Sequence, residues 1–518
     1  MADPFYITTA ISYPNGPPHI GHAYEAIAAD VIARFHKASG RDVRLVTGTD
    51  EHGLKMAQTA RAAGRDTLEF ASEMSSYFRE MCGKLNIAYD DFCRTTEPRH
   101  HRASETIWQA MAASGDLYLD RYEGWYSVRD EAFYGEGELI DGEGGQRLSP
   151  QGTPVEWTVE ESWFFRLAKY RDYLIELNET PGFLEPESRR NEVLAFLRGQ
   201  DLRDLSVSRT SFDWGVPVPG SDGHVMYVWV DALTTYLTGI GFPDGEFERW
   251  WPADLHLIGK DIVRFHAVYW PAFLKSAGLP PPGKVFGHGF LLHRGEKMSK
   301  SVGNVVDPLA LADLYGVDPL RYFLMREVSF GQDGSFSAEA IVTRCNAELA
   351  NSFGNLAQRV LSMIFKNLDG KLRAYPVAES ADEGLSRAVA DGIEGMRSAF
   401  ADLAFADGLQ AWMQAVFACN QFVDEQAPWA LRKTDPERMG AVLMVLFRCV
   451  HDLAIAVRPV VPASADALLE QMGIAAQDRD FAALDDDEWF EKLAASGFRL
   501  AQPVGVFPRL ELAQDEAA

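Results

Sequence analysis

A run of ten residues near the N-terminus, Tyr13-Pro-Asn-Gly-Pro-Pro-His-Ile-Gly-His22, constrains the fold of this chain more than any other stretch. Residues 5–11 before it are β-branched and aromatic and predict a buried strand, while apolar residues after it keep a helical period until Gly40. A strand, a turn rich in Pro and Gly, and a helix therefore follow one another. The N-terminus of such a helix offers unpaired N–H groups and a positive dipole end, which suit a phosphate group.

His19 and His22 lie three residues apart on the first turn of this helix, so both side chains reach the same face. Both can donate to phosphoryl oxygens as charge builds in a transition state. The spacing fits neither the dinucleotide motif GxGxxG nor the P-loop. Two histidines at a helix start are also common as ordinary surface residues, and these four letters alone leave both interpretations open.

A second run, Lys297-Met-Ser-Lys-Ser301, is flanked by Arg294-Gly295 and Val302-Gly303 and is predicted to be a loop. Two lysines three residues apart, with hydroxyls between and after them, can bind a polyphosphate from the side opposite the histidines. Alone, such a run is typical of a solvated loop. The functional interpretation therefore depends on finding both runs in one chain.

Composition narrows the class of protein. With 518 residues the chain is long enough for roughly three or four domains of about 150 residues each. No run approaches about 18 apolar residues, so we expect no membrane span, and the first predicted strand leaves no room for a targeting peptide. The cysteines are scattered and never form CxxC, which predicts free thiols in a reducing cytoplasm and no structural zinc. They are Cys82, Cys93, Cys345, Cys419 and Cys449.

The formal net charge of −26 argues against nonspecific binding of nucleic acid. An RNA partner would have to bind local basic patches in a repelling background. Lys366, Lys371 and Arg373 form one such group in the sequence.

The order of predicted elements divides the chain into an α/β body, an insertion and a helical end. Strands and helices alternate over residues 1–117, the pattern of a doubly wound parallel sheet of the Rossmann type. Hairpin patterns followed by helices mark 118–222 as an inserted connective domain, and the α/β pattern returns at 223–280. Residues 281–336 carry the lysine run in a hairpin-like loop, and 337–518 show long amphipathic stretches typical of an all-α helix bundle.

Polar residues follow the predicted strands where these would meet at one edge of the sheet. Asp50 follows the strand at 41–48, where it suits a substrate amine or a helix N-cap equally well. Residues 225–236 and 255–266 are each predicted as a strand that runs into a helix. The side chains on one side of the first of these junctions are by default hydrophobic core. They are Trp229, Ala232, Leu233 and Tyr236.

The paired histidines and paired lysines, in this order, resemble the signature motifs of class I aminoacyl-tRNA synthetases. Within that class the chain resembles the methionyl-tRNA synthetases over nearly its whole length. Five further stretches carry this resemblance, each matched in place and in order. They are Ala10-Ile-Ser-Tyr-Pro-Asn-Gly16, Val228-Trp-Val-Asp-Ala232, Gly259-Lys-Asp-Ile-Val-Arg-Phe-His266, Asn355-Leu-Ala-Gln-Arg359 and Glu425-Gln-Ala-Pro-Trp429.

The resemblance implies two reaction steps at one site. ATP with Mg²⁺ activates L-methionine to methionyl-adenylate and pyrophosphate, and the methionyl group then passes to the 3′ end of tRNA(Met), initiator and elongator alike. By the same resemblance His19 and His22 stabilise the α- and β-phosphates, Lys297 and Lys300 hold the leaving pyrophosphate, and Asp261 binds the ribose. The positions implied for ATP binding are His19, Gly21, His22, Gly259, Asp261, Lys297, Ser299 and Lys300.

The resemblance also implies an amino-acid pocket and an anticodon site. Asp50 matches the position that receives the substrate ammonium. The rest of the implied methionine pocket is Ile11, Tyr13, Trp229, Ala232, Leu233, Tyr236 and His266, whose aromatic wall suits a polarizable thioether. Asn355, Arg359 and Trp429 match the anticodon readers of an anticodon-binding bundle, although Trp429, which follows a proline, is also typical of a packed core residue.

The chain departs from many members of this family in two respects. Many relatives carry zinc-binding cysteines in the inserted domain, near residues 126–145 here, and this stretch has none. We therefore expect no zinc and no metal beyond Mg-ATP. Other relatives add a C-terminal dimerising domain after the helical part, with which this chain ends, so we expect a monomer.

Three alternative functions fit the sequence less well. A class I synthetase for leucine, isoleucine or valine would carry an editing insertion larger than 118–222, and a cysteine enzyme would place zinc ligands in its pocket stretches, which lack Cys. A noncatalytic tRNA-binding descendant would not need both the histidines and the lysines. A small nucleotidylyltransferase would have no use for a helical domain of this size. Ligation of methionine to tRNA is the predicted function.

Overall fold

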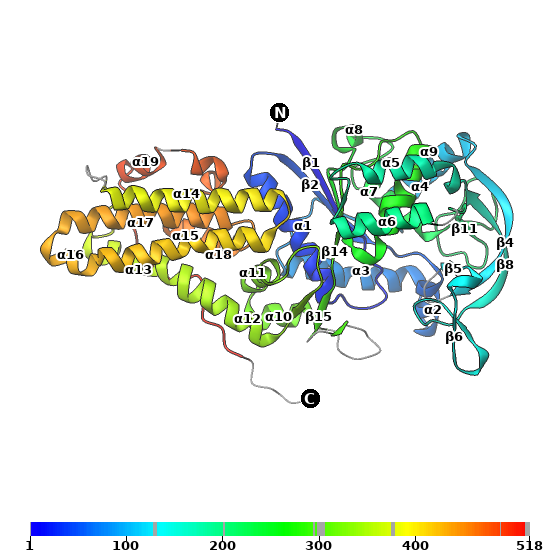
Figure 1. Ribbon diagram of the computed structural model, residues 1–518, viewed down its shortest axis with the longest axis horizontal. Helices are drawn as coiled ribbons and strands as arrows, with labels where there is room; N and C mark the ends of the chain where they lie inside the picture. The colour runs from blue at the N-terminus through cyan, green and yellow to red at the C-terminus, as the bar shows by residue number, and fades with distance from the viewer. Residues whose placement is uncertain are drawn as a thin grey trace.

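The structure, a computed structural model, describes residues 2–127, 132–199, 202–293, 296–297, 306–373, 379–486 and 488–512. The molecule is elongated. A helical bundle forms one end, and the long strands β4 and β8 form the other (Figure 1). The α/β body predicted from the sequence lies between them.

The centre of the body is a parallel sheet. In the described residues it has six strands in the order β3-β2-β1-β13-β14-β9. They are β1 (Pro4–Thr9), β2 (Asp42–Thr49), β3 (Asp91–Arg94), β9 (Leu184–Glu185), β13 (Leu255–Gly259) and β14 (Val285–His288). The direction of winding changes between β1 and β13, and an open α/β sheet binds its ligand at the carboxyl ends of such a pair. The predicted fold class is confirmed, and the turn after β1 lies at this switch point.

Helices cover both faces of the sheet and divide the core into two clusters. The helices of the body are α1 (Ile20–Ala38), α2 (Leu54–Ala62), α3 (Thr67–Lys84), α4 (Pro98–Ala113), α7 (Val228–Thr238), α8 (Phe247–Trp250) and α9 (Trp270–Ser276). The helix that carries His22, α1, is buried nearly all round: Ile27, Ala28 and Val31 have no exposed surface. Such a helix is held by packing on all sides, which fixes its N-terminus firmly beside the sheet.

The segment after α4 builds a separate antiparallel sheet. Its order is β10-β8-β4-β5, from β4 (Leu117–Ser127), β5 (Ala132–Tyr134), β8 (Glu156–Phe165) and β10 (Leu205–Ser206). Smaller elements here are β6 (Ile140–Asp141), β7 (Arg147–Leu148), β11 (Ser208–Arg209), α5 (Arg171–Glu179) and α6 (Glu187–Gly199). Between α5 and α6 the chain contributes β9 to the central sheet. The domain limits drawn from the sequence stay a prediction.

Two strand predictions differ from the structure. The strand predicted to open 225–236 is only β12 (Val225–Met226), which pairs antiparallel with β11 outside the parallel sheet, so that Trp229 lies in the first turn of α7. Conversely, residues 285–288 were predicted as part of a hairpin-like loop but form β14 inside the parallel sheet. Val285-Phe-Gly-His288 is short and lacks the long apolar run of a buried strand, and the conspicuous lysine run follows it closely.

The C-terminal part is helical, as predicted. Its helices are α12 (Ala338–Cys345), α13 (Asn355–Asn367), α14 (Ser380–Ala401), α15 (Phe405–Gln426), α16 (Pro428–Thr434), α17 (Pro436–Val457), α18 (Pro462–Gln471) and α19 (Trp489–Ala495), with a π-helical stretch at Asn346–Gly354. Among the described residues α17 alone is long and apolar enough to cross a membrane, with a mean hydropathy of 1.9. Because 83% of that apolar window is buried inside the protein, α17 packs as the core helix of the bundle.

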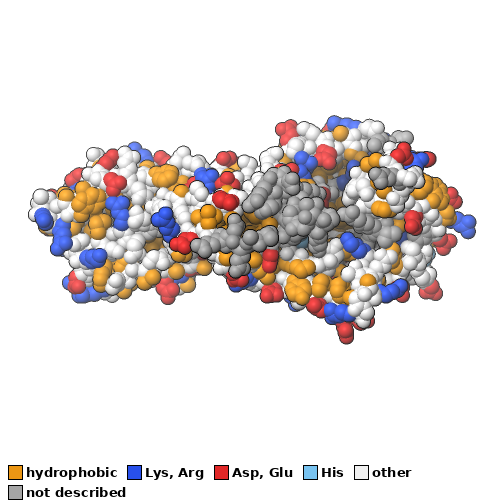
Figure 2. Space-filling model, turned by 90° about the horizontal axis from the view of Figure 1, so that it is seen from below, with side chains coloured by type: hydrophobic (Ala, Val, Ile, Leu, Met, Phe, Trp, Pro, Cys, Tyr) orange, Lys and Arg blue, Asp and Glu red, His pale blue; other side chains and the backbone are white. Residues whose placement is uncertain are grey.

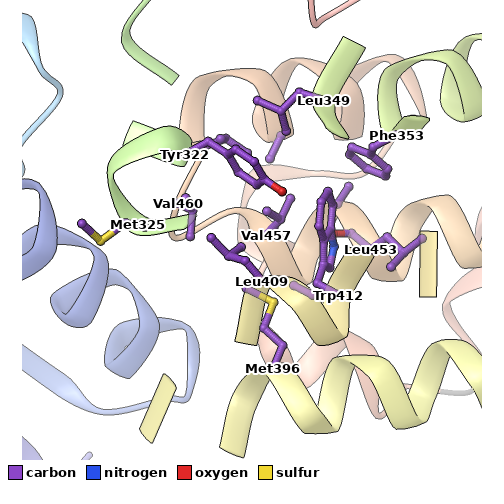
Figure 3. Packing of buried hydrophobic residues seen from close by; sticks show 14 of the residues in the cluster. Tyr322, Met325, Leu349, Phe353, Met396, Leu409, Trp412, Leu453, Val457 and Val460 are labelled. Atoms are coloured by element: carbon purple, nitrogen blue, oxygen red, sulfur yellow. The ribbon is translucent and has the colours of Figure 1, made fainter. Parts of the chain in front are cut away.

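The bundle joins the body through α11 (Val317–Glu327), which follows α10 (Pro308–Tyr315). Tyr322 of α11 faces Trp412 and other apolar side chains of the bundle, whereas Met325 lies on the side of α11 toward the blue helices of the body (Figure 3). The Tyr322 hydroxyl donates to Glu348 Oε2 at 2.6 Å. One continuous hydrophobic core therefore runs from the sheet through α11 into the bundle.

A buried arginine also connects these parts. Arg321 of α11 has no exposed surface, and its guanidinium donates to Asp30 Oδ2 of α1 at 2.6 Å. It also donates to the carbonyls of Pro459 and Val460, which follow α17, and to that of Leu85. A buried guanidinium is stable only when its N–H groups are paired, and here the partners come from the helix of the histidines and from the bundle.

Candidate active site

His19 and His22 form a reciprocal cap at the start of α1. The Nδ1 of His19 accepts from the Gly21 backbone N–H at 3.1 Å, and the Nδ1 of His22 accepts from the His19 backbone N–H at 3.1 Å. The two rings stack with their centroids 3.8 Å apart. Because each Nδ1 is an acceptor, the proton of a neutral ring is on Nε2, so both histidines present N–H donors beside the helix N-terminus.

A cavity of about 310 Å³ opens beside these histidines at the carboxyl ends of β1 and β13. All of the described residues predicted for ATP binding whose side chains the structure shows line it: His19, Gly21, His22, Gly259 and Asp261. A Cβ at Gly259 would lie 2.7 Å from Asp261 Oδ1, so a larger residue here would displace this carboxylate from its place at the cavity. The structure therefore brings together two motifs about 240 residues apart in the chain, as expected at a switch point.

The described residues on either side of the lysine run, Lys297 and Val306, lie at this site. Lys297 ends β16 (Glu296–Lys297), which pairs with β15 (Leu291–His293), and Leu291 of β15 lines the cavity. At the other end, the Val306 carbonyl accepts from the backbone N–H of Ile20, the residue after His19. Ser299 and Lys300, two of the predicted ATP-binding residues, lie outside the described residues, as does the side chain of Lys297. The described backbone nevertheless reaches Lys297 on one side of the run and resumes at Val306, beside the histidines, on the other.

A buried ion pair that the sequence did not point to also lines the cavity. His288, at the end of β14, has its Nε2 2.8 Å from Glu25 Oε2 and its Nδ1 2.9 Å from the Gly289 carbonyl. Burial alone would lower the pKa of His288, but the Glu25 carboxylate and the Gly289 carbonyl raise it above the ordinary value. The second Glu25 oxygen accepts from the Ala10 backbone N–H. This pair ties α1, β14 and the turn after β1 together around the cavity.

The residues predicted for the methionine side chain lie mainly on α7 and just after β13. Ala232, Leu233, Tyr236 and His266 are buried, and Trp229 stacks on Phe265 with ring centroids 3.5 Å apart. Unlike the described ATP residues, they are not among the residues that line the cavity. Tyr13 lies with Met56 and Trp214 in a small separate cluster. Ile11 is partly exposed beside the strand ends.

The tautomer of His266 follows from its partners. Its Nδ1 lies 2.9 Å from the Ile262 carbonyl, and its Nε2 lies 2.6 Å from the Tyr236 hydroxyl. Burial lowers the pKa of His266 to about 4 and raises that of Tyr236 well above its ordinary value. The ring is therefore neutral. It donates a hydrogen bond from Nδ1 and accepts one from the Tyr236 hydroxyl at Nε2.

Asp50 lies at the carboxyl end of β2, next to the segment that carries Tyr13. Its backbone N–H donates to the Ser12 carbonyl at 2.9 Å, and the Ser12 N–H donates to Gly48. The Asp50 side chain is buried, and one oxygen is 3.4 Å from the His52 backbone N–H. The carboxylate predicted to accept the ammonium therefore lies at the edge of the sheet, on a backbone segment fixed by these hydrogen bonds.

Two of the predicted anticodon residues meet at the far end of the bundle. The guanidinium of Arg359 on α13 lies 5.6 Å from the ring centre of Trp429 on α16, and it pairs with Asp424 at 3.0 Å. Asn355 is exposed one turn before Arg359 on the same helix. Trp429 is 51% exposed, so it is not the packed core residue that its place after a proline also allows.

Comparison with known proteins agrees with this geometry. The family of class I tRNA synthetases (M) matches residues 5–361, and the anticodon-binding domain of methionyl-tRNA ligase matches residues 377–517. The methionine–tRNA ligase of Brucella suis is 55% identical over 99% of both chains, and that of Mycobacterium bovis is 54% identical over 98% of both. The chain belongs to the methionyl-tRNA synthetases.

Solved methionyl-tRNA synthetases share the whole fold. The Mycobacterium tuberculosis enzyme in complex with methionyl-adenylate superimposes with a TM-score of 0.92 at 53% identity, covering 98% of this chain and 100% of that one. Its free form superimposes with a TM-score of 0.87 at 49% identity, covering 99% of each. The resemblance inferred from motifs thus extends to the fold of this methionyl-tRNA synthetase from end to end.

Several polar residues around the site of this methionyl-tRNA synthetase were missed from the sequence. Besides Glu25 and His288, they include a buried carboxylate, Asp231, between His52 and His100. The spacing of Glu25 from His22 on α1 was an available signal, since residues i and i+3 share a helix face. The other partners come from separate elements, so no local pattern marks them.

Proposed function

We propose that the residues around this cavity activate L-methionine with ATP and that the same site then transfers the methionyl group to tRNA(Met). The observation that carries the proposal is the cavity itself. It unites the histidine cap, Gly259 and Asp261, and Lys297 and Val306, on either side of the lysine run, lie beside it. The relative from M. tuberculosis, solved with methionyl-adenylate, supports the same chemistry here.

In the first step an oxygen of the methionine carboxylate attacks the α-phosphorus of ATP, and the bond to the β-phosphate bridge oxygen breaks, releasing pyrophosphate. The protein supplies positioning and charge stabilisation, and no covalent nucleophile is required. The Nε2–H groups of His19 and His22 donate to phosphoryl oxygens. Lys297 and Lys300 hold the pyrophosphate, with Ser299 between them, and Asp261 binds the ribose hydroxyls.

Mg²⁺ enters with the nucleotide, bound mainly by its phosphates. No zinc is needed, since residues 126–145 lack cysteine, the ligand of structural zinc sites in this part of many relatives. The five cysteines are buried free thiols, which suits a cytoplasmic enzyme. We extend the proposal to a monomer that acts away from membranes.

Methionine binds with its ammonium at Asp50 and its side chain among Ile11, Tyr13 and the residues of α7. A thioether gains from contact with aromatic rings, and Trp229 and Tyr236 provide them. Because the Tyr236 hydroxyl donates its hydrogen bond to His266, its oxygen toward the substrate can act only as an acceptor. Leu233 and Ala232 supply the remaining apolar wall.

For the second step the enzyme must choose tRNA(Met). Splayed anticodon bases stack on aromatic rings and on guanidinium planes, and Trp429 and Arg359 offer one of each at the exposed end of the bundle, with Asn355 for base edges. Initiator and elongator tRNA(Met) present the same anticodon to this site. Lys and Arg side chains gather on this end of the molecule, which gives the acidic chain a local basic surface (Figure 2).

The test is ATP–pyrophosphate exchange with each of the twenty amino acids, using protein with and without prior treatment with a chelator and Mg²⁺ restored. We expect exchange with methionine alone, at the same rate in both preparations. Exchange driven by leucine, valine or cysteine would contradict the pocket assignment. Loss of exchange after chelation that zinc restores would contradict the zinc-free site, and no exchange at all would contradict the activation step.

A further inference from the structure

A carboxylate without an assigned role lies fully buried on α7, the helix that carries most of the residues predicted for the methionine side chain. Asp231 stands on α7 between Trp229 and Ala232 and has no exposed surface. Its Oδ2 lies 2.5 Å from His52 Nδ1, and its Oδ1 lies 2.6 Å from His100 Nε2. Burial opposes ionisation, but the charges and hydrogen bonds of His52 and His100 hold the pKa of Asp231 well below its ordinary value. A buried carboxylate is tolerated only with such partners.

The two histidines connect Asp231 to different parts of the body. His100 lies on α4, and its other ring nitrogen is 3.0 Å from Thr238 Oγ1 at the end of α7, so it fixes Asp231 with respect to two packed helices. His52 lies in the turn after β2, two residues beyond Asp50. Asp231 therefore joins this turn to the helix that carries the side-chain wall of the pocket.

The turn at 50–53 is also held to β3 and the residues after it. The buried Glu51 carboxylate accepts from the Arg94 guanidinium at 2.6 and 2.8 Å and from the Thr96 hydroxyl at 2.6 Å. The Glu51 backbone N–H donates to Thr95 Oγ1 at 2.8 Å, and the Glu51 carbonyl accepts from Trp214 Nε1 at 2.7 Å. Gly53 has a φ of 104°, which lets the chain leave the turn directly into α2. Among the described contacts, the bond from His52 to Asp231 is the one that fixes the turn to α7.

We propose that Asp231 is a positioning residue for recognition of the substrate ammonium: through His52 it holds the turn that aims the Asp50 carboxylate into the methionine pocket. This rests on the proposed role of Asp50. The side-chain wall on α7 and the ammonium acceptor on the turn are then kept in register by one buried hydrogen bond. A carboxylate that must meet an ammonium within hydrogen-bond distance gains from such preorganisation, since small misplacement weakens a charged hydrogen bond strongly.

The test compares L-methionine with 4-(methylthio)butanoate, which keeps the thioether and the carboxylate but lacks the ammonium. The dissociation constant of the analogue divided by that of L-methionine, both measured by competition in exchange, reports ammonium recognition alone. For Asp231→Asn we expect this ratio to fall at least about tenfold, while binding of the analogue and the KM for ATP stay within about twofold. A merely structural role would weaken both ligands and leave the ratio unchanged, and that result would overturn the proposal.

A second pair of variants keeps the test valid if Asp231→Asn folds poorly. Asparagine carries its N–H₂ near the place of the histidine Nδ1, so His52→Asn retains the donor to Asp231 and His52→Ala removes it. We expect His52→Ala to lower the ratio and His52→Asn to restore most of it; equal ratios for these two variants would overturn the proposal.

The controls separate this inference from the proposed function. His101→Asn changes the neighbouring histidine of α4, whose ring centre is 5.6 Å from that of His52, and it should leave the ratio unchanged. Asp50→Asn should bring the ratio close to one. If Asp50→Asn keeps the wild-type ratio, the assigned role of Asp50 is wrong. If Asp50→Asn brings the ratio close to one but Asp231→Asn leaves the ratio unchanged, only the role proposed for Asp231 is wrong.

Discussion

At the scale of single residues, the protonation of the site histidines follows from their neighbours. His19 and His22 accept at Nδ1 from backbone N–H groups, whereas His266 donates from Nδ1 to a carbonyl. The former two thereby present N–H donors to an anion, and the latter presents an acceptor to Tyr236. The same residue type thus performs opposite tasks on the two sides of one site.

The buried state of His266 gives a prediction about stability and pH. Its pKa of about 4 lies below the ordinary 6.5, so between these values the unfolded chain binds a proton that the folded protein does not. The stabilisation is complete above about pH 6.5 and is lost as the pH falls toward 4. We expect the wild type to lose about 2 kcal/mol more unfolding free energy than His266→Gln between pH 7.5 and pH 5.

Urea unfolding at the two pH values measures this difference. Comparing the wild type with the variant cancels the contributions of histidines away from this one, such as His36, whose pKa is also lowered by burial. Parallel losses in the two proteins would contradict the assignment of a neutral His266.

At the scale of elements, the contact between α1 and α11 depends on a buried charge. Replacing Arg321 with methionine keeps much of the apolar stem but leaves Asp30 with fewer partners and three carbonyls without donors. Breaking a buried pair in this way costs about 3–5 kcal/mol. We therefore expect Arg321→Met to lower the unfolding free energy by that amount in urea.

A surface pair serves as the matched control. Arg198 pairs with Glu179, and both side chains are about half exposed. Such pairs contribute less than about 1 kcal/mol, so Arg198→Met should unfold close to the wild type. If Arg321→Met were as mild as Arg198→Met, the buried pair would not be the link between these helices.

Much of the local structure could be predicted from the sequence because local rules decide it. The strand, Pro/Gly turn and helix around His19 form as expected, as do the long amphipathic helices of the bundle. The strand at 285–288 was misassigned because its neighbours on both sides in the sheet, not its own pattern, make it a strand. Asp231 was missed because its partner His52 is 179 residues away. The resemblance supplied site residues that periodicity alone would assign to the core.

At the scale of the whole molecule, the sites proposed for activation and for tRNA selection lie at separate places. The cavity is in the body, and Trp429 is on α16 near the opposite end of the bundle (Figure 1). We expect Trp429→Ala to lower aminoacylation of tRNA(Met) by roughly tenfold or more, since base stacking contributes about 1–3 kcal/mol, and to leave methionine-dependent exchange unchanged.

The control for this variant is Phe417→Ala. Phe417 lies on α15 of the same bundle and is also 51% exposed, so both changes remove one exposed aromatic ring. Aminoacylation by Phe417→Ala should match the wild type. Equal losses in the two variants, or a loss of exchange in Trp429→Ala, would argue against anticodon recognition at this position.

The reach of Arg321 has a consequence for how the chain can be divided. The two matched families end at residue 361 and begin at 377, which suggests a natural place to cut. Yet a fragment that stopped there would lack Pro459 and Val460, the carbonyl partners of a guanidinium in its own interior, and would uncover the apolar face of α11. The isolated body would be prone to aggregate, and on heating the intact chain would lose body and bundle in one cooperative transition. The body and the bundle, which carry the two proposed sites, are thus a single folding unit.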